Sequence, residues 1–222
     1  MPNWCYNTLT IRGDNDTVAA LMARAATGDN DYVGPFNPRS PAEEKVDWGT
    51  FTPVQMELLM KDDDLFRDKR QVLPPLSFHA FVPVPREVML APYDPGSLEK
   101  RKAEYPEWFD RFPGLIAGYD WEHKNWGVKW GARDVSISDK TEINGETEVV
   151  YAFDTAWGPP TEFMDRLAAL YPTLQFHLSF TEEGVGFEGD YYWSDGVCTG
   201  MDDRECEEEE EEDEWEEEED EE

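Results

Sequence analysis

Cysteine is scarce in this 222-residue sequence, which has three cysteines, at positions 5, 198 and 206. No two of them form a Cys-x-x-Cys pair, and no group of cysteines and histidines has the spacing of metal ligands. Zinc sites, iron–sulfur clusters and disulfide frameworks all depend on such arrangements. The sequence therefore predicts no metal and no cofactor.

Long apolar runs are missing as well. No stretch approaches the roughly 20 apolar residues that span a bilayer. The opening Met-Pro-Asn-Trp-Cys has no basic region followed by an apolar segment, as a secretory signal would have. We therefore expect no membrane partner and, with no disulfide framework, a location in the reducing cytoplasm of a host cell.

Basic residues are greatly outnumbered. The sequence has 19 Lys and Arg against 51 Asp and Glu, which gives a formal net charge of -32. Residues 202–222 contain 18 acids and one arginine, so they carry 17 of these charges and the rest of the chain carries 15. Affinity for nucleic acid comes largely from Lys and Arg that displace counterions. Direct binding of nucleic acid is therefore not expected.

Motifs of catalysis are also missing from the sequence. It has no glycine-rich phosphate loop and no nucleophile elbow, and Gly184-Val185-Gly186 has the character of a turn. We assign no catalytic residue, and the sequence favours a protein that is not an enzyme.

The first half of the sequence opens with clear signals and then loses them. Residues 3–12 alternate polar and apolar side chains, which predicts a strand. Asp14 or Asp16 can cap a helix whose apolar residues have the spacing of one buried face, and Gly28 would end it. From residue 29 to about 118, clusters of Pro and Gly interrupt the pattern. Within this region we expect helices at 54–70 and 98–109 and a strand at 76–82.

The second half has sharper signals. Asn144-Gly145 suits a type I′ turn and predicts a hairpin with strands at 134–143 and 146–157. A helix should follow Gly158-Pro159-Pro160 and end near Tyr171. Strands are predicted at 174–180 and 185–193.

This order of elements predicts an α+β fold with a ferredoxin-like β-α-β-β-α-β sheet and one extra strand. We place the core at residues 1–28 and 119–200. A long helical and irregular insertion, packed on the core, takes 29–118. A disordered polyanionic tail takes 201–222, because self-repulsion keeps such segments extended.

Four local sequences stand out together. They are Met-Pro-Asn-Trp-Cys at residues 1–5, Phe-Val-Pro-Val-Pro at 81–85, the run at 119–130, and Phe-Asp-Thr-Ala-Trp-Gly-Pro-Pro at 153–160. Together they resemble the YubB-like family of plasmid and bacteriophage proteins. The resemblance covers Met1 to about Trp193 and leaves the acidic tail outside. It implies a ferredoxin-like domain and a mobile-element context, but no established chemistry.

The segment Asn-Trp-Gly-Val-Lys-Trp at residues 125–130 is the densest candidate for a binding site. Its amide, amine and two indoles suit a small polar pocket with stacking walls, or else a structural cluster that fixes the insertion against the sheet. The candidate residues are Asn125, Trp126, Lys129 and Trp130. The motif at 153–160 adds Trp157 and Asp154, and Asp154 can pair with Lys129 as a structural ion pair or as an acid–base couple.

The predicted sheet also has a second face. If Cys5 points inward, then Trp4 and Tyr6 point to the other face, where Tyr151 and Phe153 can join them. Such a face is typical of sheets that stack RNA bases on aromatic rings. The alternative is that the insertion covers it.

The acidic tail is either a solubilising segment or a functional polyanion that imitates the spaced charge of nucleic acid. In the second case, Trp215 would anchor it as the one aromatic residue of residues 202–222.

Three hypotheses follow for function. The first is a non-enzymatic phage or plasmid accessory protein that binds a basic host protein through acidic surfaces. It would act as a nucleic-acid mimic or as an inhibitor of a host nucleic-acid-handling or defence factor. The second is a single-stranded nucleic-acid binder whose own tail inhibits it. The third is an enzyme with a site near Lys129 and Asp154. The sequence gives no indication of the oligomeric state.

Overall fold

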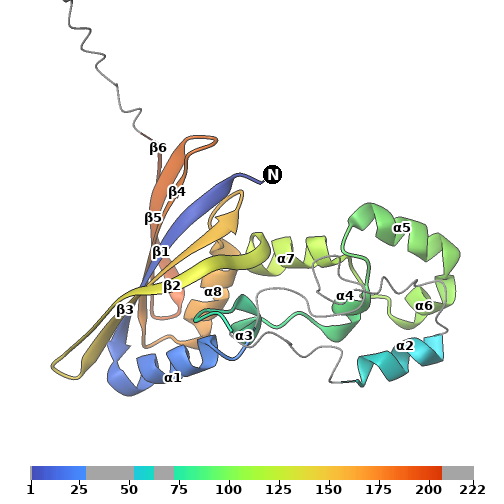
Figure 1. Ribbon diagram of the computed structural model, residues 1–222, viewed down its shortest axis with the longest axis horizontal. Coiled ribbons are helices and arrows are strands. Elements are labelled where there is room, and N and C mark those ends of the chain that lie inside the picture. The colour runs from blue at the N-terminus through green and yellow to red at the C-terminus, as the bar shows by residue number, and fades with distance from the viewer. Residues whose placement is uncertain (1, 29–52, 63–72, 207–222) are drawn as a thin grey trace, which may run out of the picture.

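A six-stranded antiparallel sheet forms one end of the molecule, and short helices extend away from it (Figure 1). The computed structural model describes residues 2–28, 53–62 and 73–206. The strand order is β2-β3-β1-β4-β5-β6. The strands are β1 Trp4–Asp14, β2 Lys129–Ile143, β3 Glu146–Ala156, β4 Gln175–Glu182, β5 Phe187–Ser194 and β6 Val197–Glu205. The first four strands, with α1 (Asn15–Ala25) and α8 (Thr161–Leu170), follow the ferredoxin-like order, in agreement with the predicted class.

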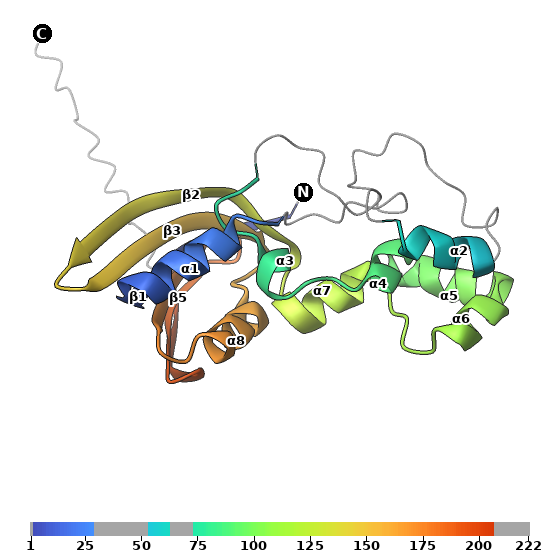
Figure 2. The same ribbon diagram turned by 90° about the horizontal axis from the view of Figure 1, so that it is seen from below.

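Helices α1 and α8 lie on the same side of the sheet (Figure 2). Helix α1 begins after Asp14, whose side chain accepts a hydrogen bond from the backbone N–H of Thr17, as an N-cap does. Its buried residues are Val18, Leu21 and Ala25, and those of α8 are Phe163, Met164, Leu167 and Ala168. These residues and the inward side chains of the strands form the main core.

Strand β6 corrects two expectations. We expected one strand beyond the ferredoxin-like order and a tail from residue 201, but the structure has two extra strands, and β6 continues to Glu205. The sequence of β6 lacks a clear apolar alternation because this edge strand is mostly exposed. Its pairing with β5 runs from Val197 to Glu205. The rest of the predicted tail, with Trp215, lies outside the described residues.

The insertion divides between two hydrophobic clusters. Its helices are α2 Pro53–Met60, α3 Phe78–Phe81, α4 Arg86–Leu90, α5 Pro95–Glu104, α6 Pro106–Arg111 and α7 Gly118–Trp126. Helix α3 joins the main core through Phe78 and Phe81. A second cluster forms away from the sheet and contains the buried residues Leu90, Ala91, Trp108 and Leu115. The described insertion thus packs only in part on the sheet domain.

Local signals explain where the expected insertion elements differ from the structure. The predicted strand at 76–82 contains helix α3, which begins after Ser77, whose hydroxyl accepts from the backbone N–H of Ala80. The predicted helix at 98–109 is two helices, because Tyr105 precedes a proline and a residue in that position avoids helical angles. The predicted helix at 54–70 corresponds to α2, and residues 63–72 lie outside the described part. None of the described helices is long and apolar enough to cross a membrane.

Candidate functional site

The side of the sheet opposite α1 and α8 presents the even-numbered residues of β1, and we call it the open face. The expected orientation of β1 is confirmed, because Cys5 is fully buried while Tyr6 is 50% exposed. Paired positions on neighbouring strands continue this face. It comprises Trp4, Tyr6, Thr8, Thr10, Arg12, Arg133, Glu146, Glu148, Asp154, His177, Ser179, Glu188, Asp190, Tyr192, Asp202 and Arg204.

Two aromatic residues that we expected on the open face point the other way. Tyr151 and Phe153 are almost completely buried in the main core. They pair with Leu9 and Asn7 of β1, and directly opposed residues of antiparallel strands share a face. The aromatic side chains that are exposed on the open face include Tyr6 and Tyr192, at 50% and 43%. The described part of the insertion therefore does not cover this face completely.

The fold separates the residues of the segment at 125–130, because the first two belong to helix α7 and the last two lie beyond its end. Trp126 is fully buried, and its Nε1 donates to the backbone carbonyl of Val82 at 3.1 Å. The Nδ2 of Asn125 donates to the carbonyl of Trp121, one turn earlier in α7, at 2.8 Å. Gly127 ends the helix with a φ of 80°. Asn125 and Trp126 thus act as structural residues, and Trp126 has no surface to offer a partner.

Lys129 and Trp130 lie beyond the end of α7. The Lys129 ammonium sits 4.3 Å from the ring centroid of Trp130 and 5.3 Å from that of Tyr119, as in cation–π contacts. In the sheet, Lys129 is opposite Ala156, whereas Asp154 is opposite Arg133. The expected ion pair between Lys129 and Asp154 is absent from the described part of the chain. An acid–base couple of these two residues is therefore not supported.

Trp4 and Trp130 form the walls of a cavity, which we call the tryptophan cavity. Their ring centroids are 6.3 Å apart, with an angle of 45° between the planes. Together with Arg133 and Asp134 they line a volume of about 360 Å³. Trp157 lies at the same end of the sheet, where its backbone N–H donates to the carbonyl of Asn3. Trp157 is 50% exposed.

Strained backbone is concentrated around this cavity. Trp130, Asp134 and Trp157 have φ angles of 77°, 47° and 73°, a region that bulky residues rarely occupy. Such conformations cost on the order of 1–3 kcal/mol each and persist where the surroundings enforce them. The carboxylate of Glu122 is fully buried and accepts from the backbone N–H of Trp130 at 3.0 Å. The same oxygen accepts from the hydroxyl of Tyr93 at 2.5 Å, so Trp130 is held by a buried polar network.

Asp154 is a carboxylate in an unfavourable position. Burial, and next the nearby Asp134 carboxylate, raise the pKa of Asp154 above its ordinary value. A raised pKa in the folded state means that ionised Asp154 destabilises the fold at neutral pH, and this penalty is relieved as the pH falls through that pKa.

The change Asp154→Asn should therefore stabilise the protein at pH 7. We expect the melting temperature to rise by about 1–3 °C, because a ΔΔG below 1 kcal/mol gives shifts of this size in a chain of this length. The advantage over the wild type should shrink as the pH falls through the raised pKa of Asp154. The exposed Asp139, changed to Asn, controls for the general relief of negative charge. Equal gains from both variants at pH 7 would contradict the assignment.

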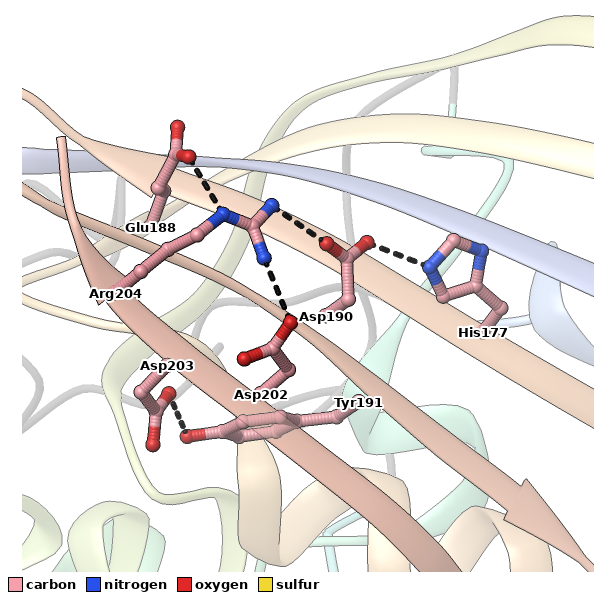
Figure 3. Close-up of polar contacts among 7 residues, drawn as sticks. All are labelled: His177, Glu188, Asp190, Tyr191, Asp202, Asp203 and Arg204. Atoms are coloured by element: carbon pink, nitrogen blue, oxygen red, sulfur yellow. Dashed lines mark hydrogen bonds and ion pairs between the residues drawn. The ribbon is translucent and has the colours of Figure 1, made fainter. Parts of the chain in front are cut away.

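The other half of the open face is dominated by Arg204 (Figure 3). Its Nε and Nη2 donate to Glu188 and Asp190, both at 2.8 Å, and its Nη1 donates to Asp202 at 3.1 Å. The first cause of a lowered pKa at Asp190 is its bond with Arg204. Figure 3 also shows His177, whose Nε2 lies 2.7 Å from the other oxygen of Asp190. One guanidinium is thus shared by three carboxylates.

A second cavity of about 360 Å³ opens on the same face beside this network. Its lining includes Arg12, Glu148, His177 and Tyr192. The imidazole of His177 stacks on the ring of Tyr192, with centroids 4.5 Å apart. Arg12 forms an ion pair with Glu146 at 2.7 Å.

Among the candidate residues, Trp4 and Tyr6 were expected on this face, and Lys129, Trp130, Asp154 and Trp157 were expected in a pocket or a structural cluster. Several residues that lie beside them in the structure were missed. These residues are Glu122, Arg133, Asp134, His177 and Arg204. Glu122 lies within the motif run at 119–130, so it could have been considered, whereas Asp134 and Arg204 had no local signal. In the described part of the chain, no three His, Cys, Asp or Glu residues are placed to hold a metal ion.

One comparison with known proteins, the match to a family model, supports the fold of the C-terminal half. Residues 125–221 match a family described as the ferredoxin-like domain in Api92-like protein. A crystal structure of protein api92 from Yersinia pseudotuberculosis is 12% identical, with a TM-score of 0.46, and covers 93% of this chain and 99% of that chain. No curated protein sequence matches. The resemblance to the YubB-like family stays a prediction.

Proposed function

We propose that this is a non-enzymatic binding protein whose open face docks a basic protein. The observation that carries the proposal is the state of two arginines on that face. Arg204 is shared by three carboxylates, and Arg12 is paired with Glu146. These two cations are therefore compensated within the face. The third arginine of the face, Arg133, is opposite Asp154 in the sheet, so the face has little excess positive charge to attract phosphate groups.

The remaining chemistry of the open face suits a basic partner. Exposed Tyr6 and Tyr192 offer the kind of aromatic contact area that dominates binding at protein interfaces. Glu148 and Asp154 add negative charge that would complement a positive surface and speed encounter. The sequence of residues 207–222 brings a further 15 acids, which extend this negative charge. In the mobile-element context, the partner would be a host protein that handles nucleic acid.

The proposal is tested by affinity capture from a bacterial lysate, followed by reconstitution with the purified captured protein. The wild-type chain should enrich proteins with a pI above about 9. Binding should weaken steeply with salt, because exposed charges are screened over about 8–10 Å at physiological ionic strength. Glu148→Lys should reduce binding, whereas Glu107→Lys, an equal charge change on α6, should have little effect. Captured proteins no more basic than the lysate would contradict the proposal.

A second candidate is binding of single-stranded nucleic acid, favoured by the aromatic residues Trp4, Tyr6 and Tyr192 on one sheet face. Each stacked base can contribute about 1–3 kcal/mol. If the acidic segment inhibits this activity, then deleting residues 207–222 should increase affinity for an oligouridylate or oligothymidylate at low salt. Fluorescence anisotropy measures this directly. Absence of binding by both forms would remove this candidate.

A further inference from the structure

We infer that the tryptophan cavity is the anchor of the docking surface and that it binds the guanidinium group of an arginine side chain. This inference rests on the proposed function, because it names the group of the basic partner that enters the site. The cavity, its aromatic walls and its carboxylates each support this assignment.

The walls of the cavity suit a planar cation. A guanidinium or ammonium group is attracted to an indole face within about 6 Å of the ring centroid, and Trp is the strongest such partner. The structure contains one example, since the Lys129 ammonium lies 4.3 Å from the centroid of the Trp130 ring. Trp4 supplies a second indole, 6.3 Å from the first. A ligand in the cavity would therefore meet the surfaces of both indoles.

Two carboxylates, those of Asp134 and Asp154, meet at the rim of the cavity, where Arg133 is the cation among the lining residues. Asp134 lines the cavity itself. The carboxylate of Asp154 lies near enough to that of Asp134 to be destabilised by it. A single positive charge between them would relieve this repulsion.

Arginine fits this arrangement better than lysine. Its planar fork can donate two hydrogen bonds to one carboxylate while its face stacks on an indole, and it is less strongly hydrated than an ammonium. A base of a nucleic acid could also stack on one of the tryptophans, but the phosphates of its chain would meet Asp134 and Asp154. The carboxylates thus favour the guanidinium.

The cavity is also preorganised. The buried Glu122 carboxylate fixes the backbone of Trp130, and Trp130 and Asp134 are held at positive φ before any ligand arrives. Groups that are already ordered lose less conformational freedom on binding, which improves affinity. A binding role would give this strained arrangement a use.

The test is a titration of the full-length protein, followed through the indole N–H signals of Trp4 and Trp130 by NMR. The probes are N-acetyl-arginine methylamide, the lysine analogue and the citrulline analogue, which has nearly the shape of arginine without its charge. We expect saturable shifts with arginine, and about tenfold weaker binding of citrulline, as for loss of a charge-assisted pair. Trp4→Ala and Asp134→Asn should each weaken arginine binding several-fold.

Asp195→Asn is the matched control, because Asp195 has a φ of 52° like Asp134 but lies in the turn between β5 and β6. It should leave arginine binding unchanged. Equal binding of arginine and citrulline, or an unchanged affinity in Asp134→Asn, would overturn the inference. The inference would also be overturned if an oligouridylate caused these NMR shifts at a lower concentration than the arginine probe does. If basic proteins are captured but the arginine probe causes no saturable shift, the docking proposal stands and the arginine site is contradicted. If the arginine probe binds but no basic protein is captured, the docking proposal is contradicted.

Discussion

Replacing Trp126 by alanine should lower the free energy of unfolding by about 3–5 kcal/mol, the usual cost of removing a large aromatic side chain from a core. Trp126 is fully buried and packs edge-to-face against Phe78 and Trp121, with ring centroids 5.9 Å and 5.5 Å away. Its indole N–H also satisfies the carbonyl of Val82. The loss of stability therefore has two causes, a cavity in the core and a buried carbonyl, that of Val82, without its hydrogen-bond donor.

Urea denaturation at equilibrium measures this effect, and two variants separate its parts. Trp126→Phe keeps an aromatic ring but leaves the Val82 carbonyl unpaired, at a cost of about 1–3 kcal/mol. Trp157→Ala removes a tryptophan that is 50% exposed, so it should be much milder. If Trp126→Ala were no more destabilising than Trp157→Ala, Trp126 would not be a core residue, and its assignment to the binding surface would have to be restored.

Replacing Gly127 by alanine should have the second largest effect, about 2 kcal/mol or more. Gly127 has a φ of 80°, where an L-residue costs roughly 1–2 kcal/mol. A methyl group there would also overlap the carboxylate of Glu162, and it would lie 3.3 Å from the backbone nitrogen of the same residue. The change thus disturbs the junction between α7 and α8.

Two other glycines isolate these contributions. Gly145 has a φ of 87° with nothing within 4 Å of an added methyl, so Gly145→Ala reports the backbone cost alone. Gly114 also has open space and no positive φ, so Gly114→Ala should be nearly neutral. We expect destabilisation in the order 127, 145, 114, measured by thermal unfolding. Equal effects at 127 and 145 would show that Glu162 moves aside at no cost.

The strongly periodic elements could be predicted from the sequence. The alternation before Gly13 and the capped helix after it correspond to β1 and α1. The hairpin turn has the expected positive φ angles at Asn144 and Gly145, 55° and 87°. Helix α8 follows the predicted prolines, and β4 buries the predicted apolar residues. In each case local propensity and tertiary burial favour the same structure.

The sequence predicted which types of residue form the candidate site, but not how these residues are arranged. The pairing of β2 with β3 shifts between Lys129 and Arg133, where Trp130 and Gly131 both have positive φ. This irregularity places Arg133 opposite Asp154, where an uninterrupted register would place Gly131. No sequence pattern reveals how many residues such a bulge inserts, although bulges often re-aim side chains near functional sites. Arg204 was missed for another reason, because its acidic neighbours resembled the start of a tail.

The central claim is that the open face, and not only the acidic segment at 207–222, binds a basic protein. The most direct measurement is the affinity of the purified captured partner for the chain without residues 207–222, with and without the changes Trp4→Ala and Asp134→Asn. We predict that the deletion weakens binding but preserves its dependence on salt, and that the two changes then abolish it. Loss of all binding on deletion alone, or full binding after the two changes, would contradict the claim.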